Sequence, residues 1–406
     1  MKNYVIIGGG IAALGCIDGI KKHDRDGKIT LICGENVLPY ARPLISYYLE
    51  NKTDFDKMQY RDEEFYKSID VKKGITAEKI DGKKVILSDG EEIPFDKLLL
   101  ATGSSPFVPP IPGLDSVKNK FTFMTEEDAA GLEAAVTEKS RVLIVGAGLI
   151  GLKCAEGLKE RAAEITVCDL ADRVLSSILD TECAAIVEEK LKKSGIKFML
   201  SDTAEKFSGN SAQMKSGKTV DFDVLVMAVG VRANTALAKE TGAEVNRGVI
   251  VNNKMETTVP GIYAAGDVTE GEDISSGSKK VMAILPNAYM GGLCAGCNMA
   301  GADNSFDTQI PMNSIGFFGY HMMSAGSYDG ELYEEKDGDN IKKLFIKDNR
   351  LIGFILLGNV DKAGILTALI RNKTQIDTID FGLMKKNLSL LPFSQEYRRK
   401  NLGGVV

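Results

Sequence analysis

The sequence predicts an α/β protein with two dinucleotide-binding units and a C-terminal α+β domain. An apolar run, a glycine-rich turn and a helical pattern follow one another within residues 3–22, and the same order returns within residues 142–161. Residues 342–358 instead show two apolar runs joined by a polar Asp-Asn-Arg turn. An amphipathic helical pattern follows at residues 361–372.

The first unit has the full pattern of a dinucleotide-binding turn. A short buried strand is expected at residues 3–8, a helix to about Lys22, and a second strand at residues 28–35. The first glycine permits the tight turn, and the second lets backbone N–H groups approach a pyrophosphate at the helix N-terminus. The alanine keeps the helix close to the strand, and the acid after the second strand can bind ribose hydroxyls. The predicted contacts are Gly8, Gly10, Ile11, Ala12, Ala13 and Glu35.

The second unit repeats this pattern with all three glycines present. Strands are expected at residues 142–145 and 165–167, with a helix between them to about Arg161. Upstream, Thr125 to Asp128 has the form of a capping box at the start of another helix. Two complete turns indicate two different dinucleotides. The predicted contacts are Gly146, Gly148, Leu149, Ile150, Gly151 and Asp169.

Composition and charge narrow the function classes. Of the 406 residues, 44% are hydrophobic and 26% are charged, which is ordinary for a globular protein. The net charge of −6 argues against nucleic acid as the main ligand.

The opening apolar run contains three consecutive glycines, which favours a folded element over a signal peptide. No apolar stretch reaches the roughly 18–20 residues that span a bilayer, so we expect no membrane span and a cytoplasmic location.

The numbers and contexts of the cysteines and histidines argue against a metal site or a catalytic triad. The seven cysteines lie mostly in apolar contexts, which is typical of reduced, buried thiols. Cys294 and Cys297 have a suggestive spacing, but a helical pair of small buried residues explains them better than a redox or metal site. The two histidines are His23 and His321, and the strand-like context of His321 predicts a packed core position. We therefore expect no metal.

Three further segments carry a family resemblance. They are "LLLATGSSP" (98–106), "VLVMAVGVRANTAL" (224–237) and "VPGIYAAGDVTEG" (259–271). Together with the two glycine turns, they resemble the flavoproteins of the pyridine nucleotide oxidoreductase superfamily over nearly the whole chain. In that family the first unit binds FAD, the second binds the nicotinamide nucleotide, and a Gly-Asp pair contacts the flavin ribityl chain.

The resemblance implies a nested domain layout and further cofactor contacts. Two Rossmann-like domains are expected, with the NAD-binding domain (113–252) inserted in a discontinuous FAD-binding domain (1–112 and 253–305). A C-terminal α+β domain is expected from 306 to 406. The further contacts that the resemblance implies are Arg42, Pro43, Ala77, Ala101, Thr102, Gly103, Gly230, Gly266, Asp267, Asn287 and Ala288.

The segment "PYARPLIS" (39–46) resembles the cysteine-free branch of this superfamily. That branch contains NADH:rubredoxin reductases, ferredoxin reductases of oxygenase systems and the N-terminal part of the nitrite reductase large subunit. In disulfide-reducing relatives the redox cysteine falls where Pro43 stands. The resemblance therefore implies that the flavin accepts a hydride from the nicotinamide and releases the electrons without a thiol relay.

The expected activity is that of an FAD-dependent NADH oxidoreductase that reduces a small redox protein such as rubredoxin or ferredoxin. Three alternatives stay open: an electron-entry subunit of a larger iron–sulfur complex, an NADH oxidase or peroxide reductase, and a nucleotide-responsive binding module. A homodimer is also compatible with the sequence. Asp169 predicts NADH over NADPH because a carboxylate there binds both ribose hydroxyls and repels a 2′-phosphate. Arg173 is the nearby cation that could oppose this preference.

Two positions depart from the branch. The family often has lysine where Tyr47 stands and glutamate where Lys153 stands, and that pair lies beside the flavin ring. We expect Lys153 in the first turn of its helix, where it supplies the positive charge, with Tyr47 packed beside it as the second catalytic residue. The alternative is a solvated lysine whose stem covers apolar surface.

Leu285 matches the family's aromatic position near the nicotinamide. The basic run from Arg398 to Lys400 is a candidate docking site for an acidic acceptor.

Overall fold

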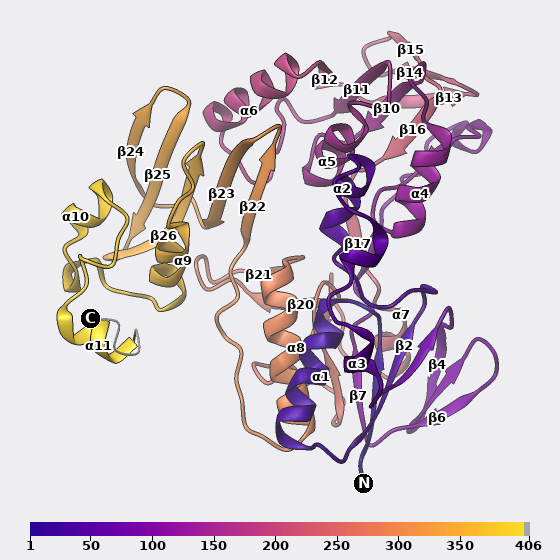
Figure 1. The fold of residues 1–406 in the computed structure, drawn as a ribbon, viewed down its shortest axis with the longest axis vertical. Helices are drawn as coiled ribbons and strands as arrows, with labels where there is room; N and C mark the ends of the chain where they lie inside the picture. The colour runs from indigo at the N-terminus through magenta and orange to yellow at the C-terminus, as the bar shows by residue number, and fades with distance from the viewer. Residues whose placement is uncertain (402–406) are drawn as a thin grey trace. The chain divides into compact units, whose positions relative to one another are not determined.

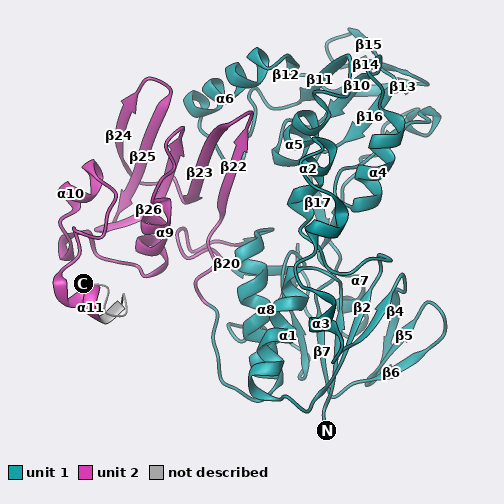
Figure 2. Ribbon diagram, viewed as in Figure 1, with its two compact units in different colours: residues 1–271, 280–306 teal, residues 272–279, 307–406 magenta. Residues whose placement is uncertain are grey.

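The computed structural model describes residues 1–401, and the side chains as far as residue 399. These residues form two compact units (Figure 2). The larger unit contains residues 1–271 and 280–306, and the smaller unit contains residues 272–279 and the chain from residue 307 onward. None of the helices among the described residues is long and apolar enough to cross a bilayer.

A five-stranded parallel sheet forms the first half of the larger unit (Figure 1). Its central strands are apolar on both faces, as expected for a parallel sheet covered on both sides. One edge strand of this sheet comes from far along the chain, beyond the residues that form the second parallel sheet. In spatial order the strands are β19 (Ile262–Ala264), β7 (Lys97–Leu100), β1 (Asn3–Ile7), β2 (Lys28–Cys33) and β3 (Asp70–Lys73).

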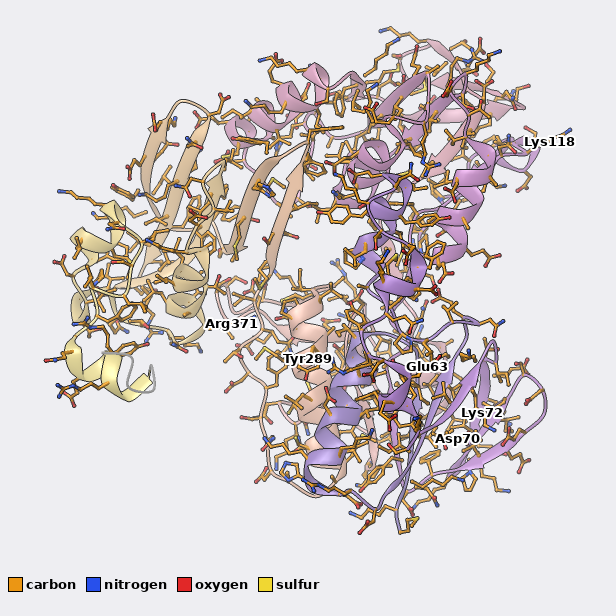
Figure 3. The ribbon with its side chains drawn as sticks, in the orientation of Figure 1. Glu63, Asp70, Lys72, Lys118, Tyr289 and Arg371 are labelled. Atoms are coloured by element: carbon orange, nitrogen blue, oxygen red, sulfur yellow. The ribbon has the colours of Figure 1, made fainter. Side chains whose placement is uncertain are left out.

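Two helices lie side by side over this sheet, α1 (Ile11–His23) and α8 (Leu285–Met299). Glycines let their backbones approach closely. A Cβ atom at Gly292 would lie 2.0 Å from the Ala12 carbonyl oxygen, and one at Gly296 would lie 2.0 Å from that of Cys16. Tyr289 on α8, labelled in Figure 3, donates a hydrogen bond of 3.0 Å to Asp18 on α1. The pair brings the segment around residue 290 against the first glycine turn.

A second five-stranded parallel sheet forms the other half of the larger unit. The helix α4 (Glu126–Ala135) precedes its central strand, and Thr125 and Asp128 form the expected capping box. The helix α5 (Leu149–Leu158) follows that strand, and α6 (Thr181–Lys193) follows the next. In spatial order the strands are β12 (Ile196–Leu200), β11 (Glu164–Asp169), β10 (Arg141–Val145), β16 (Val224–Met227) and β9 (Lys120–Phe121).

Short elements complete the larger unit. The strands β8 (Ser104–Pro106) and β17 (Val231–Ala233) pair where the chain passes between the two parallel sheets. The remaining strands form small sheets: β4 (Ala77–Asp81), β5 (Lys84–Leu87) and β6 (Glu92–Pro94); β13 (Ala204–Ser208), β14 (Ser211–Met214) and β15 (Thr219–Asp221); and β18 (Val249–Ile250), β20 (Thr269–Glu272) and β21 (Lys279–Val281). The short helices are η1 (Arg42–Leu44), α2 (Ile45–Leu49), η2 (Phe55–Met58), α3 (Glu63–Tyr66), η3 (Leu114–Ser116) and α7 (Ala236–Glu240).

The smaller unit is an antiparallel sheet with helices on one face. The helix α9 (Ala363–Arg371) packs its apolar face on the sheet, as the sequence predicted. The two strands expected at residues 342–358 are present, and their turn places Asp348 and Asn349 at positive φ. The strands in order are β22 (Met312–Phe317), β23 (Tyr320–Gly326), β26 (Arg350–Leu357), β25 (Asn340–Lys347) and β24 (Glu331–Asp337), and the other helices are η4 (Ile376–Thr378), α10 (Phe381–Lys386) and α11 (Gln395–Asn401).

The predicted core position of His321 was wrong. Its side chain is exposed on β23, where its ring lies against Gly316 of the neighbouring strand β22. Successive side chains of a strand point to opposite faces, and the next residue, Met322, takes the buried position.

Candidate functional site

A cavity of about 480 Å³ lies in the larger unit at the carboxyl ends of the first parallel sheet. The residues that follow β1, β2, β7 and β19 form its wall, which is the usual ligand position in an open α/β sheet. Most of the contacts predicted for the first dinucleotide line it: Gly8, Gly10, Ile11, Ala12, Glu35, Arg42, Ala77, Ala101, Thr102, Gly103, Gly266, Asp267 and Ala288, together with Leu285.

Four predicted contacts lie elsewhere. Ala13 is fully buried inside α1, and Asn287 is buried in α8. Pro43 stands in η1 directly after Arg42, and Gly230 lies in the link between β16 and β17 with φ +115°. None of the four is among the residues that line the cavity.

The first glycine turn has the geometry of a phosphate cradle. Gly8 has φ +119°, and a Cβ atom there would lie 2.0 Å from the Ala101 carbonyl oxygen. Gly10 is the N-cap of α1, and no atom lies within 4 Å of where its Cβ would be. The N-terminus of a 13-residue helix therefore opens into the cavity without a side chain in the way, which suits a pyrophosphate.

Glu35 belongs to a hydrogen-bond network that extends to the start of α4. Its carboxylate forms an ion pair with Arg42 and accepts a 2.8 Å hydrogen bond from the Tyr40 hydroxyl. The same hydroxyl accepts a 2.8 Å hydrogen bond from the Glu126 backbone N–H, and Arg42 donates to the Met124 carbonyl oxygen at 3.0 Å. Burial raises the pKa of Tyr40, so its hydroxyl stays protonated and can donate.

Asp267 lies in the same cavity at the end of β19. It follows Gly266, which has φ +84°, and its partly buried carboxyl group lies 3.5 Å from the Ser104 hydroxyl. Burial raises the pKa of Asp267 above the usual carboxyl value. A partly buried acceptor that lines a cavity suits a polyhydroxyl chain such as the flavin ribityl group.

Sequence reasoning missed several residues that line the cavity, among them Ser104, Met124, Thr125 and Asn234. Asn234 donates to the Thr102 carbonyl oxygen at 2.9 Å, and the Thr102 hydroxyl donates to the Asn234 carbonyl oxygen at 2.8 Å. Ser104 lies in β8 and Asn234 directly follows β17, both inside segments quoted above, while Met124 and Thr125 precede α4; only the fold brings these residues together at the cavity.

The second glycine turn repeats the geometry of the first. Gly146 has φ +118°, and a Cβ atom there would lie 2.2 Å from the Ala228 carbonyl oxygen. Gly148 is the N-cap of α5 with open space around it, so the turn formed by Gly146, Gly148, Leu149, Ile150 and Gly151 can also receive a pyrophosphate. Two turns of this kind within one compact unit fit two dinucleotides.

Asp169 stands at the end of β11 and braces this turn. Its carboxylate accepts hydrogen bonds from the backbone N–H groups of Ala147 at 2.7 Å and Ala171 at 2.8 Å. The nearby cation Arg173 forms an ion pair with its neighbour Asp172 at 2.8 Å. The second turn therefore carries a carboxylate that two backbone N–H groups hold in place.

Lys153 was expected in the first turn of α5 but lies just beyond it. The helix begins at Leu149, directly after the second glycine, so Lys153 is its fifth residue and the predicted first-turn position was wrong. The Lys153 ammonium lies 5.1 Å from the centroid of the Tyr47 ring and forms an ion pair with Glu156. The predicted contact between Tyr47 and Lys153 is therefore present.

The cysteines are free thiols in buried positions. Burial raises the pKa of Cys33, which stands behind the first glycine turn, to about 12, and that of Cys294 to about 11. No cysteine lines the cavity. Within the described part of the chain, no group of three or more potential ligands could hold a metal ion.

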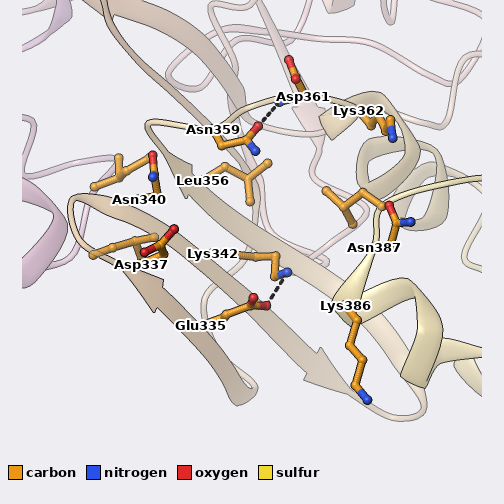
Figure 4. A pocket seen from close by; sticks show the side chains of 13 residues that line it. Glu335, Asp337, Asn340, Lys342, Leu356, Asn359, Asp361, Lys362, Lys386 and Asn387 are labelled. Atoms are coloured by element: carbon orange, nitrogen blue, oxygen red, sulfur yellow. Dashed lines mark hydrogen bonds and ion pairs between the residues drawn. The ribbon is translucent and has the colours of Figure 1, made fainter.

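The smaller unit contains a separate hollow of about 320 Å³ between β25, β26 and α10 (Figure 4). Its lining mixes acids, amides and lysines. The Lys342 ammonium pairs with Glu335 at 2.5 Å, and the Asn359 side chain accepts from the Asp361 N–H at 3.1 Å. It lacks the open helix N-terminus and the glycine turn of the nucleotide sites.

Comparisons with known proteins agree with the presence of two dinucleotide-binding turns. Residues 2–292 match the family model of the pyridine nucleotide-disulphide oxidoreductases. The chain belongs to this family. Residues 311–374 match the model of the rubredoxin NAD+ reductase C-terminal domain. The chain is therefore a flavoprotein oxidoreductase whose cofactors are FAD and NAD(P)H.

Individual relatives cover most of the chain. It is 31% identical over 390 residues to the NADH-dependent phenylglyoxylate dehydrogenase subunit epsilon of Aromatoleum evansii, covering 92% of both chains. It is 38% identical over 318 residues to an NADH oxidase of Methanocaldococcus jannaschii, covering 74% of this chain and 71% of the relative. Among solved structures, a NAD-dependent persulfide reductase from A. fulgidus superposes with a TM-score of 0.86 at 27% identity, covering 99% of this chain and 84% of that one. A putidaredoxin reductase in covalent complex with putidaredoxin shares the fold, with a TM-score of 0.87 at 22% identity.

Proposed function

We propose that this protein is an FAD-dependent NADH oxidoreductase that passes electrons from the flavin, without a redox cysteine, to a small electron-transfer protein of the rubredoxin or ferredoxin type. The observation that carries the proposal is the pair of open glycine turns in one compact unit, with no cysteine among the residues that line the cavity and Pro43 directly after the lining residue Arg42. FAD, when bound, exchanges a hydride with nicotinamide and releases the two electrons singly.

The residues take distinct roles under this proposal. The N-terminus of α1 at Gly10 holds the FAD pyrophosphate, Glu35 binds the adenosine ribose, and Asp267 binds the ribityl chain. The N-terminus of α5 at Gly148 holds the nicotinamide nucleotide, and Asp169 binds its ribose and disfavours a 2′-phosphate.

The match to the C-terminal domain of rubredoxin NAD+ reductase supports a small protein acceptor. Relatives include a nitric oxide reductase FlRd-NAD(+) reductase of Klebsiella pneumoniae, 30% identical over 278 residues, with 66% of this chain and 72% of the relative covered. The local basic residues Arg398 and Arg399 on α11 are the proposed docking contacts for an acidic acceptor; the side chain of Lys400 lies outside the described residues.

A second candidate is an electron-entry subunit of a larger iron–sulfur complex. The specific observation is that the relative in Aromatoleum evansii is named as a subunit and aligns over 92% of both chains. In that case the acceptor would be a bound subunit instead of a diffusing protein.

Steady-state oxidation of NADH with a panel of acceptors tests the proposal. We expect rubredoxin or ferredoxin to be reduced faster than oxygen or hydrogen peroxide at equal concentration. Fast reduction of oxygen or peroxide with inert protein acceptors would instead identify an oxidase or a peroxide reductase. Slow turnover with every acceptor, after a rapid and lasting reduction by NADH, would identify a nucleotide-responsive binding module.

A further inference from the structure

A stretch of the first half of the larger unit lies against the helices of the second half. Residues 40–51 belong to the chain between β2 and β3 of the first parallel sheet, and they include η1 and α2. The helix α2 packs on α4 and α5, which precede and follow the central strand of the second sheet (Figure 1). A Cβ atom at Gly157 on α5 would lie 3.0 Å from the Ser46 carbonyl oxygen. We call residues 40–51 the bridging segment.

The start of the bridging segment joins the first nucleotide cavity to the first residues of α4. Arg42 lines the cavity and donates a 3.0 Å hydrogen bond to the carbonyl oxygen of Met124, which lines the cavity too. The hydroxyl of the buried Tyr40 accepts a 2.8 Å hydrogen bond from the Glu126 backbone N–H and donates one of 2.8 Å to Glu35. The start of α4 is therefore attached to the wall of the cavity.

The end of the bridging segment holds the other end of α4. The Tyr48 hydroxyl donates to the Glu133 carboxylate, and the Tyr48 ring stacks on Phe55 with centroids 3.9 Å apart. Arg161, beyond the end of α5, forms an ion pair with the same carboxylate at 3.0 Å and donates to the Asn51 side-chain oxygen at 2.6 Å. Hydrogen bonding to Glu133 raises the pKa of Tyr48 to about 12, so the hydroxyl keeps its proton at neutral pH. Glu133 thus joins α4 to α2 and to the end of α5.

Two attachments fix a helix that a single attachment would allow to pivot. Glu126 begins α4, and Glu133 lies about two turns later, roughly 10 Å along the helix axis. The backbone passes between the two halves at the short pair of strands β8 and β17. The bridging segment adds to this connection an attachment at each end of α4.

The placement of the two halves matters for hydride transfer. The first glycine turn belongs to one half and the second to the other, so their placement sets the distance between the flavin and the nicotinamide. An error of about 1 Å in the position of reacting groups can lower a rate by about 10²-fold. Contacts that fix one half on the other can therefore control the rate without touching either cofactor.

We propose that Tyr48 and Arg161 are positioning residues that, by holding Glu133, keep the nicotinamide-binding half in register with the bound flavin. This inference rests on the proposed function. None of these three residues lines the first cavity, so they act through the placement of α4 and α5 and not on the flavin itself.

Anaerobic stopped-flow reduction of the FAD-loaded protein by NADH tests this role. Glu133→Ala removes the acceptor of both Tyr48 and Arg161, so the limiting rate of flavin reduction should fall at least about tenfold. The NADH concentration that gives half of this rate should change less than about twofold, because the second glycine turn is intact. The midpoint potential of FAD should stay unchanged, because none of these side chains lines the cavity.

Single contacts are tested by milder variants. Tyr48→Phe keeps the ring that stacks on Phe55 and removes only the hydroxyl, so the limiting rate should fall about fivefold. Adding Tyr48→Phe to Glu133→Ala should cause no further fall, since the hydroxyl has already lost its acceptor. Arg161→Met should lower the limiting rate as Tyr48→Phe does.

Backbone hydrogen exchange gives a readout that does not depend on turnover. In FAD-loaded Glu133→Ala, the amides of α4 should exchange at least about tenfold faster than in the wild-type protein, while those of β10 and β11 should not change. This result would show that the attachment of α4 is lost while the second sheet stays folded.

Two matched controls separate the attachment from general effects. Glu127→Ala removes an exposed glutamate from the same helix and should leave the limiting rate unchanged. Arg141→Met breaks an ion pair of 3.2 Å with Asp223, which lies within the second half, and should also leave the limiting rate unchanged.

An unchanged limiting rate in Glu133→Ala would overturn the proposal, whatever the exchange rates are. Faster exchange in β10 and β11, or loss of FAD, would also overturn it, since Glu133 would then have a structural role alone. Failure of the proposed function would show separately, as a wild-type protein that does not pass electrons from NADH to a protein acceptor.

Discussion

At the scale of single residues, the backbone turns were predictable and the polar networks were not. Glycine spacing identifies both cradles because only glycine tolerates the positive φ of Gly8 and Gly146 and the close approach of a neighbouring carbonyl. The link from Glu35 through Tyr40 to Glu126 joins residues that are far apart in the sequence, so no local pattern reveals it. The exposure of His321 was missed because a strand-like segment does not show which of its alternating faces is covered.

The buried thiols give a prediction on cysteine chemistry. Since burial raises the pKa of Cys294 to about 11, the thiol is protonated at neutral pH and should react slowly with iodoacetamide. The stability that this group contributes is complete below its unfolded pKa near 9 and is lost as the pH rises through about 11.

Replacing Cys294 and Cys297 with alanine should leave NADH-driven dye reduction within a factor of about two, since neither thiol lines the cavity. A loss of orders of magnitude with FAD retained would assign them a redox role.

Asp169 gives a prediction on nucleotide preference. Asp169→Ala removes a charged acceptor of the Ala147 N–H and of the proposed ribose contact. A hydrogen bond to a charged group contributes about 1.5–3 kcal/mol, so kcat/KM for NADH should fall roughly tenfold to a hundredfold, and the ratio of NADH to NADPH activity should fall with it. Comparable kcat/KM values for NADH and NADPH in the wild-type protein would contradict the assignment. FAD content serves as the control, because Asp169 lies in the second turn.

At the scale of elements, hydrophobic periodicity predicted which segments form helices, but it did not predict the residue at which a helix begins. The helix α5 was expected, yet Lys153 is its fifth residue, because the start of the helix is set by where the glycine turn ends. The close packing of α1 on α8 was also beyond the sequence, since glycines on two distant helices show no pairing until the helices meet.

The α1–α8 contact predicts a large effect of one methyl group. In Gly292→Ala, the new Cβ would lie 2.0 Å from the Ala12 carbonyl oxygen, so the helices must separate. Overpacking of this kind costs about 1–3 kcal/mol, which should lower the melting temperature by several degrees. Gly364→Ala in α9 is the matched control: no atom lies within 4 Å of the new Cβ, so alanine should leave stability unchanged or raise it by up to about 1 kcal/mol. Equal melting temperatures for the two variants would contradict this packing.

At the scale of the whole molecule, the C-terminal sheet domain and two sheets of parallel strands were predictable because each has its own hydrophobic period. The assignment of FAD to the first half and of the nicotinamide nucleotide to the second stays a prediction.

The chain carries a net charge of −6, so an acidic acceptor needs a locally positive surface on which to dock. The basic residues of α11 provide such a surface.

Ionic strength tests this docking prediction. Reduction of an acidic ferredoxin should slow as salt rises, while reduction of a small neutral dye should not. Replacing Arg398 and Arg399 with glutamate should lower the rate with ferredoxin roughly tenfold by reducing the association rate, and leave the dye rate unchanged. Reduction of ferredoxin that is independent of salt and of these arginines would place the docking surface elsewhere.

The central claim is that electrons leave the flavin without passing through a thiol pair. An anaerobic reductive titration of the FAD-loaded protein with dithionite, followed at the flavin absorbance, measures this most directly. The account predicts complete reduction after about two electrons per FAD, with no further uptake. Uptake of about four electrons per FAD would reveal a redox-active disulfide in series with the flavin and would contradict the account.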